Sequence, residues 1–255
     1  MHAHGFRIEN ELYNQLYAEL RGEEDIPRLS EKYRVTQHAL RAIYSQKLVR
    51  SVRKQFHLIK ARARRLYSEW RQGKTFSQLA REYSFSPLIM ASILLQCCAG
   101  WSKRKWSEAI RFPDRVSDAR IRTEIKQALA SDPAFSPSAH ENQKRNACSW
   151  ENQVAEWLHA KKVRFLTEKD RKSAGGKTPD FLLQDALEWS GLKLKWVECK
   201  ASFGDEIETR RNLENQLKHY LRLWGPGMVI YFHGTVARPT TIPSVVVETR
   251  EVLHK

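Results

Sequence analysis

The sequence predicts an α+β protein with an all-helical N-terminal half and a C-terminal domain of helices around a small mixed sheet. Three observations support this class. A helical pattern occurs twice in the first hundred residues, and positive charge is concentrated between the two copies. From residue 149 onward, apolar runs of strand length alternate with amphipathic stretches. We expect the two domains to span residues 1–145 and 146–255.

The composition is that of a folded intracellular protein. Hydrophobic residues make up 41% of the chain and aromatic residues 10%, which argues against disorder. The cysteines are Cys97, Cys98, Cys148 and Cys199, and none forms a CxxC pair. Free thiols in a reducing compartment are therefore expected, and a structural zinc site is not. No leader-like segment or membrane-length apolar run occurs, so we expect a soluble protein without a membrane partner.

The helical pattern repeats with an offset of 50 residues, between residues 26–46 and 76–96. Each copy predicts a short helix, a tight turn and a second helix that begins after Thr36 or Ser86, where a hydroxyl can cap the helix start. This is the arrangement of a helix-turn-helix. One copy alone would fit an ordinary helical bundle equally well, but two copies around a basic segment favour nucleic-acid binding. Candidates for base contact are Gln37, His38 and Arg41.

The net charge of +15 is concentrated in one segment. Residues 47–105 contain 14 Lys/Arg and 2 Asp/Glu, which indicates a surface that binds a polyanion such as nucleic acid. A solvated basic helix that binds nothing is the alternative. Residues 47–70 are expected to form a long helix, and Trp101 and Trp106 either stack on bases or are partly buried. The candidate nucleic-acid-binding residues are Arg50, Arg53, Lys54, Lys60, Arg62, Arg64, Arg65, Lys103, Arg104 and Lys105.

The remaining elements follow from periodicity and from Gly and Pro positions. A helix is expected over 117–130 and a linker or surface loop over 131–145, because two X-Pro steps interrupt that stretch. In the C-terminal half we expect helices over 151–162 and 207–224, a glycine-containing turn over 169–177, and strands over 163–167, 178–184, 193–200, 228–233 and 244–248.

Acidic and basic residues converge on two of these strands. Asp180 and Glu198 can face each other, while Lys200, two residues after Glu198, projects from the same face and Cys199 from the other. Two buried carboxylates side by side are costly unless a divalent cation neutralises them. An ordinary salt bridge of Lys200 is the alternative, because a scattered D…ExK pattern is weak by itself. Flanking helices add Glu151 and, on one face, Gln216 and Tyr220.

Three stretches carry a family resemblance: KTPDFLLQ (177–184), WVECKASFGD (196–205) and WGPGMVIYFHG (224–234). With them the sequence resembles the TPD-motif family, typified by the codanin-1-interacting nuclease. These are PD-(D/E)XK proteins with a RecB-like core and N-terminal helix-turn-helix repeats. The resemblance covers most of residues 150–234 and, more loosely, the helical half. It implies a restriction-endonuclease-like fold for the C-terminal domain.

The resemblance also implies roles for the clustered residues. Asp180 and Glu198 would hold Mg²⁺ or Mn²⁺ with the carbonyl of residue 199, and Glu151 would complete or orient that shell. Lys200 would position and help deprotonate the attacking water and stabilise charge on the phosphate. Gln216 and Tyr220 match an accessory motif that orients the substrate backbone or the metal shell. Packing for the tyrosine and a surface position for the glutamine are the alternatives.

We therefore expect a metal-dependent nuclease that acts on nucleic acid, DNA in preference to RNA. The competing hypothesis is a nuclease-like adaptor that works with a codanin-1-like partner in chromatin assembly and erythroid differentiation without cleavage. The intact Asp180, Glu198 and Lys200 argue against the adaptor. A transcription regulator that uses the helix-turn-helix pair would leave this cluster unexplained. The resemblance implies residence in the nucleus and the cytoplasm, or in the cytoplasm if the source is prokaryotic. The oligomeric state stays open.

Overall fold

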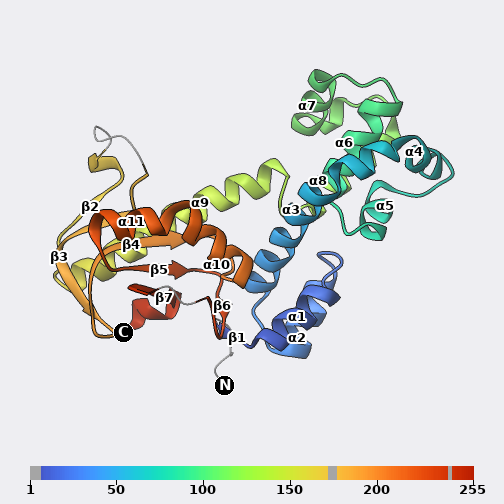
Figure 1. Ribbon diagram of the computed structural model, residues 1–255. Coiled ribbons are helices and arrows are strands. Elements are labelled where there is room, and N and C mark those ends of the chain that lie inside the picture. Colours follow the sequence, from blue (N-terminus) through green and yellow to red (C-terminus); the bar gives the residue numbers. More distant parts are fainter. Residues whose placement is uncertain (1–6, 172–176, 241–242) are drawn as a thin grey trace. The chain divides into compact units, whose positions relative to one another are not determined.

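A computed structural model describes residues 7–171, 177–240 and 243–255. It has a helical N-terminal half and a small mixed sheet in the C-terminal part (Figure 1), which confirms the predicted α+β class. Within the described ranges, no helix is both long enough and apolar enough to span a bilayer.

The chain forms two compact units, and each is assembled from separate segments. One unit combines the described residues up to Leu16 with Glu31–Ala42 and Gln143–Lys255, and the other combines Tyr17–Ser30 with Ile43–Asn142. This division differs from the linear boundary predicted at 145–146. Long-range pairing accounts for the first of these segments, because β1 (Arg7–Ile8) forms a parallel ladder with β6 (Thr235–Val236).

The two repeat copies have closely similar local backbones. Helices α2 (Asp25–Tyr33) and α3 (Gln37–Ala61) correspond to α5 (Phe76–Glu82) and α6 (Pro87–Cys98). Each turn contains one left-handed residue at the same repeat position, Arg34 with φ 55° and Ser84 with φ 47°. The predicted caps form, because the backbone NH of residue 39 donates to Thr36 Oγ1 at 3.3 Å and that of residue 89 to Ser86 Oγ at 3.0 Å.

The basic segment differs from the separate long helix predicted over 47–70. It continues the second helix of the first repeat without interruption, so that α3 covers 25 residues. The helix breaks at Arg62, whose φ of −89° and ψ of 3° depart from helical values, and α4 (Ala63–Arg71) follows. The basic side chains are therefore divided between two helices.

A buried carboxylate connects the helices of the second unit. Glu124 lies in α8 (Ala119–Ser131) and is 6% exposed. It accepts hydrogen bonds from the indole of Trp70 at 3.0 Å, the backbone NH of Phe76 at 2.9 Å and the guanidinium of Arg120 at 2.9 Å. These partners satisfy a charge that would otherwise be expensive to bury. The remaining helical elements of the N-terminal half are α1 (Asn10–Glu19), α7 (Lys103–Arg111) and η1 (Pro113–Arg115).

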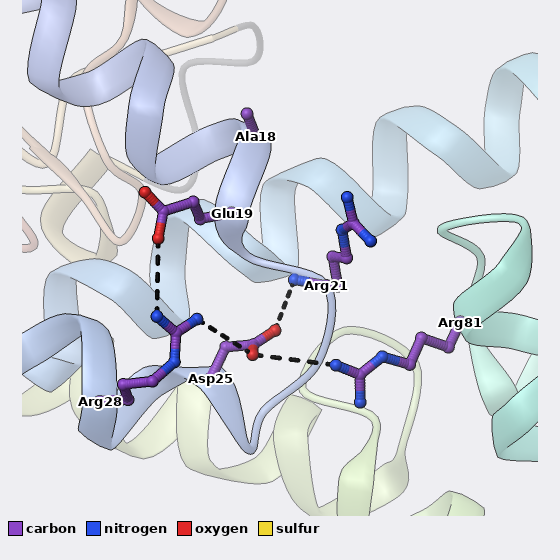
Figure 2. Close-up of a pocket in the computed structure, with 6 residues that line it drawn as sticks. All are labelled: Ala18, Glu19, Arg21, Asp25, Arg28 and Arg81. Atoms are coloured by element: carbon purple, nitrogen blue, oxygen red, sulfur yellow. Dashed lines mark hydrogen bonds and ion pairs between the residues drawn. The ribbon is translucent and has the colours of Figure 1, made fainter.

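Asp25 performs a similar task at the loop between α1 and α2 (Figure 2). Its carboxylate accepts hydrogen bonds from the backbone NH groups of Arg21 at 2.8 Å and Gly22 at 3.0 Å, and lies 3.5 Å from the guanidinium of Arg28. Arg81 reaches the same carboxylate from α5, at 3.9 Å. Two of the arginines that line this cavity of about 370 Å³, Arg28 and Arg81, are thus paired with acids of the same unit.

The prediction of a linker or loop over 131–145 is wrong from Pro137 onward, because α9 spans Pro137–Ala160. Ser136 caps this helix, since its hydroxyl accepts a hydrogen bond from the backbone NH of Ala139 at 3.1 Å. Proline is favoured at the first helical position, where its missing donor costs nothing. The Ser-Pro step therefore starts a helix in this chain, whereas the prediction took it as a break.

The C-terminal sheet has the strand order β2-β3-β4-β5-β7. Strands β2, β3 and β4 are antiparallel, and β4, β5 and β7 are parallel. A tight turn at Ser190 (φ 50°) and Gly191 (φ 77°) joins β3 to β4. The strands are β2 (Phe165–Thr167), β3 (Phe181–Trp189), β4 (Leu192–Lys200), β5 (Gly227–Tyr231) and β7 (Val245–Thr249).

Helices cover both faces of this sheet. On one face, Val154, Trp157 and Leu158 of α9 join a core that includes Val197 and Ile230. The other face is covered by the helix predicted over 207–224, which forms as α10 (Glu206–Asn212), a π-helical turn η3 (Leu213–Leu217) and α11 (Lys218–Trp224). Of the glycine-containing turn predicted over 169–177, η2 (Lys169–Arg171) is described, and 172–176 lie outside the described residues. A short η4 (Arg250–His254) follows β7.

Candidate active site

Strands β3 and β4 bring Asp180 and Glu198 together. The register pairs Phe181 with Val197, which places these carboxylates beside each other across the antiparallel ladder. The backbone NH of Asp180 donates to Glu198 Oε2 at 3.3 Å, and the backbone NH of Cys199 donates to Asp180 Oδ2 at 2.7 Å. Glu198 is only 4% exposed. Glu198 is therefore held by the backbone of Asp180, and Asp180 by the backbone of the residue that follows Glu198.

Lys200 completes the group from the same face of β4. Its Nζ donates to Glu198 Oε1 at 2.6 Å and to Gln216 Oε1 at 2.7 Å. Gln216 Nε2 in turn donates to the hydroxyl of Tyr220 at 2.5 Å, and that hydroxyl donates to the carbonyl of Thr178 at 2.6 Å. A continuous polar chain thus joins β4, the covering helix and the segment that precedes Asp180.

The π-helical turn η3 sets the position of Gln216 in this chain. A π-turn inserts extra backbone into a helix and is common at functional sites. Gln216 lies within η3, one turn before Tyr220. Tyr220 is fully buried, so the predicted alternative of helix packing holds for its ring, while its hydroxyl belongs to the polar chain. Gln216 contacts Lys200 and is not an isolated surface residue.

Burial dominates the electrostatics of the acid pair. The pKa of Asp180 is raised from 3.8 to about 7, chiefly by burial and in part by the neighbouring charge of Glu198. Burial also raises the pKa of Glu198, although Lys200 opposes the shift. Lys200 lowers the pKa of both carboxyl groups but does not offset the effect of burial, so the pair would be stabilised by further positive charge. A divalent cation would supply it.

The donor set fits a hard cation such as Mg²⁺ or Mn²⁺. Mg²⁺ is commonly bound by one or two carboxylates, with waters and substrate phosphates as further ligands. Asp180 and Glu198 provide two carboxylates. Among the residues that the structure describes, no group of three or more His, Cys, Asp or Glu side chains could hold a metal ion. Direct binding by Glu151 as a third ligand stays a prediction.

Glu151 nevertheless acts on the acid pair through its charge. It lies in α9 with its side chain exposed, and partial burial of its carboxyl raises its pKa. Its negative charge contributes to the raised pKa of Asp180. A carboxylate at this position can orient water around a cation without binding the ion directly.

Asp205, the last residue of the WVECKASFGD run, has a structural task. It is 2% exposed and caps α10 by accepting the backbone NH of Glu208 at 2.8 Å. Its other oxygen accepts the hydroxyl of Tyr13 at 2.6 Å, and the Tyr13 ring stacks on Phe203 at 5.6 Å. The Asp-x-x-Glu pattern before the helix is a capping signal that could have revealed this role.

Two basic side chains that the sequence analysis did not single out hold the segment before Asp180. Arg171 donates to the carbonyl of Pro179, and Lys177 Nζ donates to the carbonyl of Asn215 at 2.7 Å. They fix the backbone that delivers Asp180 to the site. In the sequence, only their position beside the TPD run points to this role, and that position does not distinguish them from other surface cations.

The candidate nucleic-acid-binding residues all lie in the helical unit. Most are exposed, but Arg50 is half-buried and Arg65 pairs with Glu69 at 3.0 Å. Trp101 is 8% exposed and carries Lys105 over its ring at 4.6 Å. The exposed members of the predicted set are Arg53, Lys54, Lys60, Arg62, Arg64, Arg65, Lys103, Arg104 and Lys105.

The candidates for base contact lie in the same compact unit as the sheet. Gln37, His38 and Arg41 occupy the first turns of α3 and are exposed. The pKa of His233 is lowered to about 4, chiefly by burial and in part by the charges of His38, Arg250 and Arg41. His38 and Arg41 therefore contribute positive potential within this unit, and base contact by them stays a prediction.

Comparisons with known proteins agree with the resemblance seen in the sequence. A family model described as a protein of unknown function with a TPD sequence motif matches residues 117–250. The chain is 31% identical to CDAN1-interacting nuclease 1 of Mus musculus over 168 residues, which cover 62% of this chain and 59% of that protein. Identity to the Bos taurus protein is 32% over 168 residues, and identity to the Homo sapiens protein is 30% over 167 residues, with the same coverage.

The alignment thus spans about 59% of the length of these curated relatives. No solved structure matches the chain. The matched residues 117–250 include the acid pair, Lys200 and the π-helical turn. The resemblance carried by the TPDF and ECKASFGD runs is therefore confirmed.

Proposed function

The chain belongs to the TPD sequence-motif family, and we propose that it is a divalent-metal-dependent nuclease. It hydrolyses phosphodiester bonds of nucleic acid, DNA in preference to RNA. The relatives are named nucleases, and the acid pair with its lysine provides the chemistry. In this proposal the C-terminal unit has the PD-(D/E)XK fold, and the helix pairs α2–α3 and α5–α6 are helix-turn-helix repeats.

The cation would be held by Asp180, Glu198 and the carbonyl of Cys199, with Glu151 orienting water around it. Bound there, it would supply Lewis-acid stabilisation of the phosphate and a more acidic water. Lys200 is held between Glu198 and Gln216, so its ammonium group has a fixed position beside the acids. From there it orients the attacking water and stabilises negative charge that develops on the phosphate.

The single observation that carries the proposal is the hydrogen bond between Lys200 and the buried Glu198, which lies beside Asp180. Cleavage of single-stranded, duplex and branched DNA and RNA with Mg²⁺ or Mn²⁺ tests it. Asp180→Ala should abolish cleavage, and Lys200→Ala should lower it ~100-fold or more. Asp185→Asn is a matched control, because this acid of β3 is exposed and pairs with Arg164 at 2.8 Å. Activity that survives both active-site changes would contradict the assignment.

A second candidate is an adaptor that binds a codanin-1-like protein without cleaving nucleic acid. The name of the relatives, CDAN1-interacting nuclease 1, favours it. A divalent cation separates the candidates, because a ligand that binds only the folded state raises its stability. A nuclease should show a Mg²⁺- or Mn²⁺-dependent thermal shift that Asp180→Asn removes, and an adaptor should show none.

A further inference from the structure

A cavity of about 390 Å³ lies in the helical unit, between α7, η1 and α8. Two aromatic residues, Trp101 and Phe112, contribute to its lining, together with the apolar side chains of Ala109, Val116 and Ile121. Trp101 is 8% exposed, whereas Phe112 is 39% exposed. The cavity thus combines an apolar interior with an aromatic ring that remains open to solvent. It is far larger than the space of a single water molecule.

Cations surround both aromatic rings. Lys105 Nζ lies 4.6 Å from the ring centroid of Trp101, and the guanidinium carbon of Arg115 lies 4.4 Å from that of Phe112. Arg111 lies 5.3 Å from the same Phe112 ring. Residues 101–122 contain seven Lys/Arg and three Asp/Glu. The surroundings of the cavity therefore favour a ligand that carries negative charge beside a flat, apolar group.

We propose that this cavity binds one unpaired nucleobase of a single-stranded nucleic acid, an inference that rests on the proposed nuclease function. Aromatic rings and guanidinium planes are the groups on which proteins stack splayed-out bases. Lys105 and Arg115 would contact the phosphates on either side of the base. A base within a duplex is stacked on both faces and presents only its edges, so it cannot enter such a cavity.

Two carboxylates in the lining give the cavity a preference among bases. Glu108 and Asp118 both line it. Asp118 Oδ1 accepts the backbone NH of Ile121 at 2.9 Å, which fixes the orientation of this carboxylate at the start of α8. Carboxylates accept hydrogen bonds from exocyclic amino groups, such as N4 of cytosine. Cytosine should therefore bind better than thymine, which has no amino group.

The arginine-lined cavity around Asp25 does not provide an equivalent site (Figure 2). Arg28 pairs there with Glu19 at 3.6 Å and with Asp25 at 3.5 Å. Arg81 also pairs with Asp25, at 3.9 Å, and among the described residues that line this cavity none is aromatic. The cavity at Phe112 is the better match to a nucleotide.

Fluorescence anisotropy of the full chain in chelator tests the proposal without cleavage. The probes are a labelled single-stranded dC12, a dT12 and a duplex of equal length. Phe112→Ala should weaken binding of dC12 about fivefold or more and change duplex binding less than twofold. Leu58→Ala removes a comparably exposed apolar side chain (44%) from the basic helix α3 and should leave all affinities unchanged.

The proposal would be overturned if Phe112→Ala weakened the binding of dC12 and of the duplex equally, or changed neither affinity. Ultraviolet crosslinking of dC12 to the wild-type chain, mapped by mass spectrometry, needs no variant and should label the peptide that contains Trp101 to Asp118. Labels confined to other peptides would overturn the proposal too. The proposed nuclease function fails separately, if the wild-type chain cleaves no nucleic acid in Mg²⁺ or Mn²⁺.

Discussion

Replacing Asp180 by asparagine should stabilise the metal-free protein at pH 8. In the folded protein the pKa of Asp180 is raised from 3.8 to about 7, chiefly by burial. A shift of about three pKa units corresponds to ~4 kcal/mol of penalty for the ionised carboxylate. Asparagine has nearly the same shape, carries no charge, and its oxygen can still accept the backbone NH of Cys199. We expect the free energy of unfolding to rise by ~2–4 kcal/mol. The rise can be smaller than the full penalty because Glu198 contributes part of it through its own charge.

The pH dependence of this gain follows from the direction of the shift. A raised pKa means that Asp180 favours the folded state below the unfolded pKa of 3.8, and that this contribution is lost as pH rises through about 7. Wild type and Asp180→Asn should therefore have similar free energies of unfolding at pH 4. The difference should grow between pH 4 and 7 and stay constant above.

Urea unfolding in chelator at pH 4, 6 and 8 measures this difference. Asp185→Asn is the control on the same strand, because the hydrogen bond from Arg164 lowers the pKa of Asp185 to about 2. That exposed pair should contribute little to stability, and its loss should at most slightly destabilise the protein. The reasoning is refuted if Asp180→Asn is no more stable than wild type at pH 8, or if its gain is equally large at pH 4.

Further predictions concern the metal, the polar chain and the helix cap. Because a cation requires ionised Asp180, the affinity for Mn²⁺, measured by calorimetry, should fall as pH drops below about 7; a pH-independent affinity would contradict this role. Lys200→Ala should lower cleavage ~100-fold or more while keeping a Mn²⁺-dependent thermal shift, and loss of that shift would instead indicate a structural role. Tyr220→Phe leaves the carbonyl of Thr178 without its 2.6 Å donor and should cost ~1–3 kcal/mol in urea unfolding; an unchanged stability would show that water replaces the hydroxyl. Asp205→Ala removes the cap of α10 and the partner of Tyr13, and should cost ~1–3 kcal/mol, with Tyr13→Phe costing less.

Local chemistry made much of the site predictable. The two-residue spacing of Glu198 and Lys200 on a strand places both on one face, and their contact at 2.6 Å agrees with this. The four-residue spacing of Gln216 and Tyr220 likewise predicts the contact between them. These inferences needed only the periods of strand and helix, and the contact between Gln216 and Tyr220 forms although the helix is π-helical at Gln216.

The features that were missed depend on distant partners or on ambiguous local signals. Pairing of β1 with β6 joins residues more than 220 positions apart, and no local pattern marks so short a strand. Ser136-Pro137 can end one helix or start another, and capping decides between them. The π-turn at Gln216 has no signature in the helical periodicity. Glu151 could be assigned to a helix, but its distance from the acid pair depends on how α9 packs against the sheet.

The central claim is that Asp180, Glu198 and Lys200 cut nucleic acid with a bound divalent cation. The most direct measurement is cleavage of a labelled single-stranded oligonucleotide at pH 8 by wild type, Asp180→Asn and Asp185→Asn, over a titration of Mn²⁺. We predict saturable cleavage by wild type and Asp185→Asn, no cleavage in chelator, and none by Asp180→Asn at any Mn²⁺ concentration. Cleavage by Asp180→Asn at the wild-type rate, or in chelator, would contradict the claim.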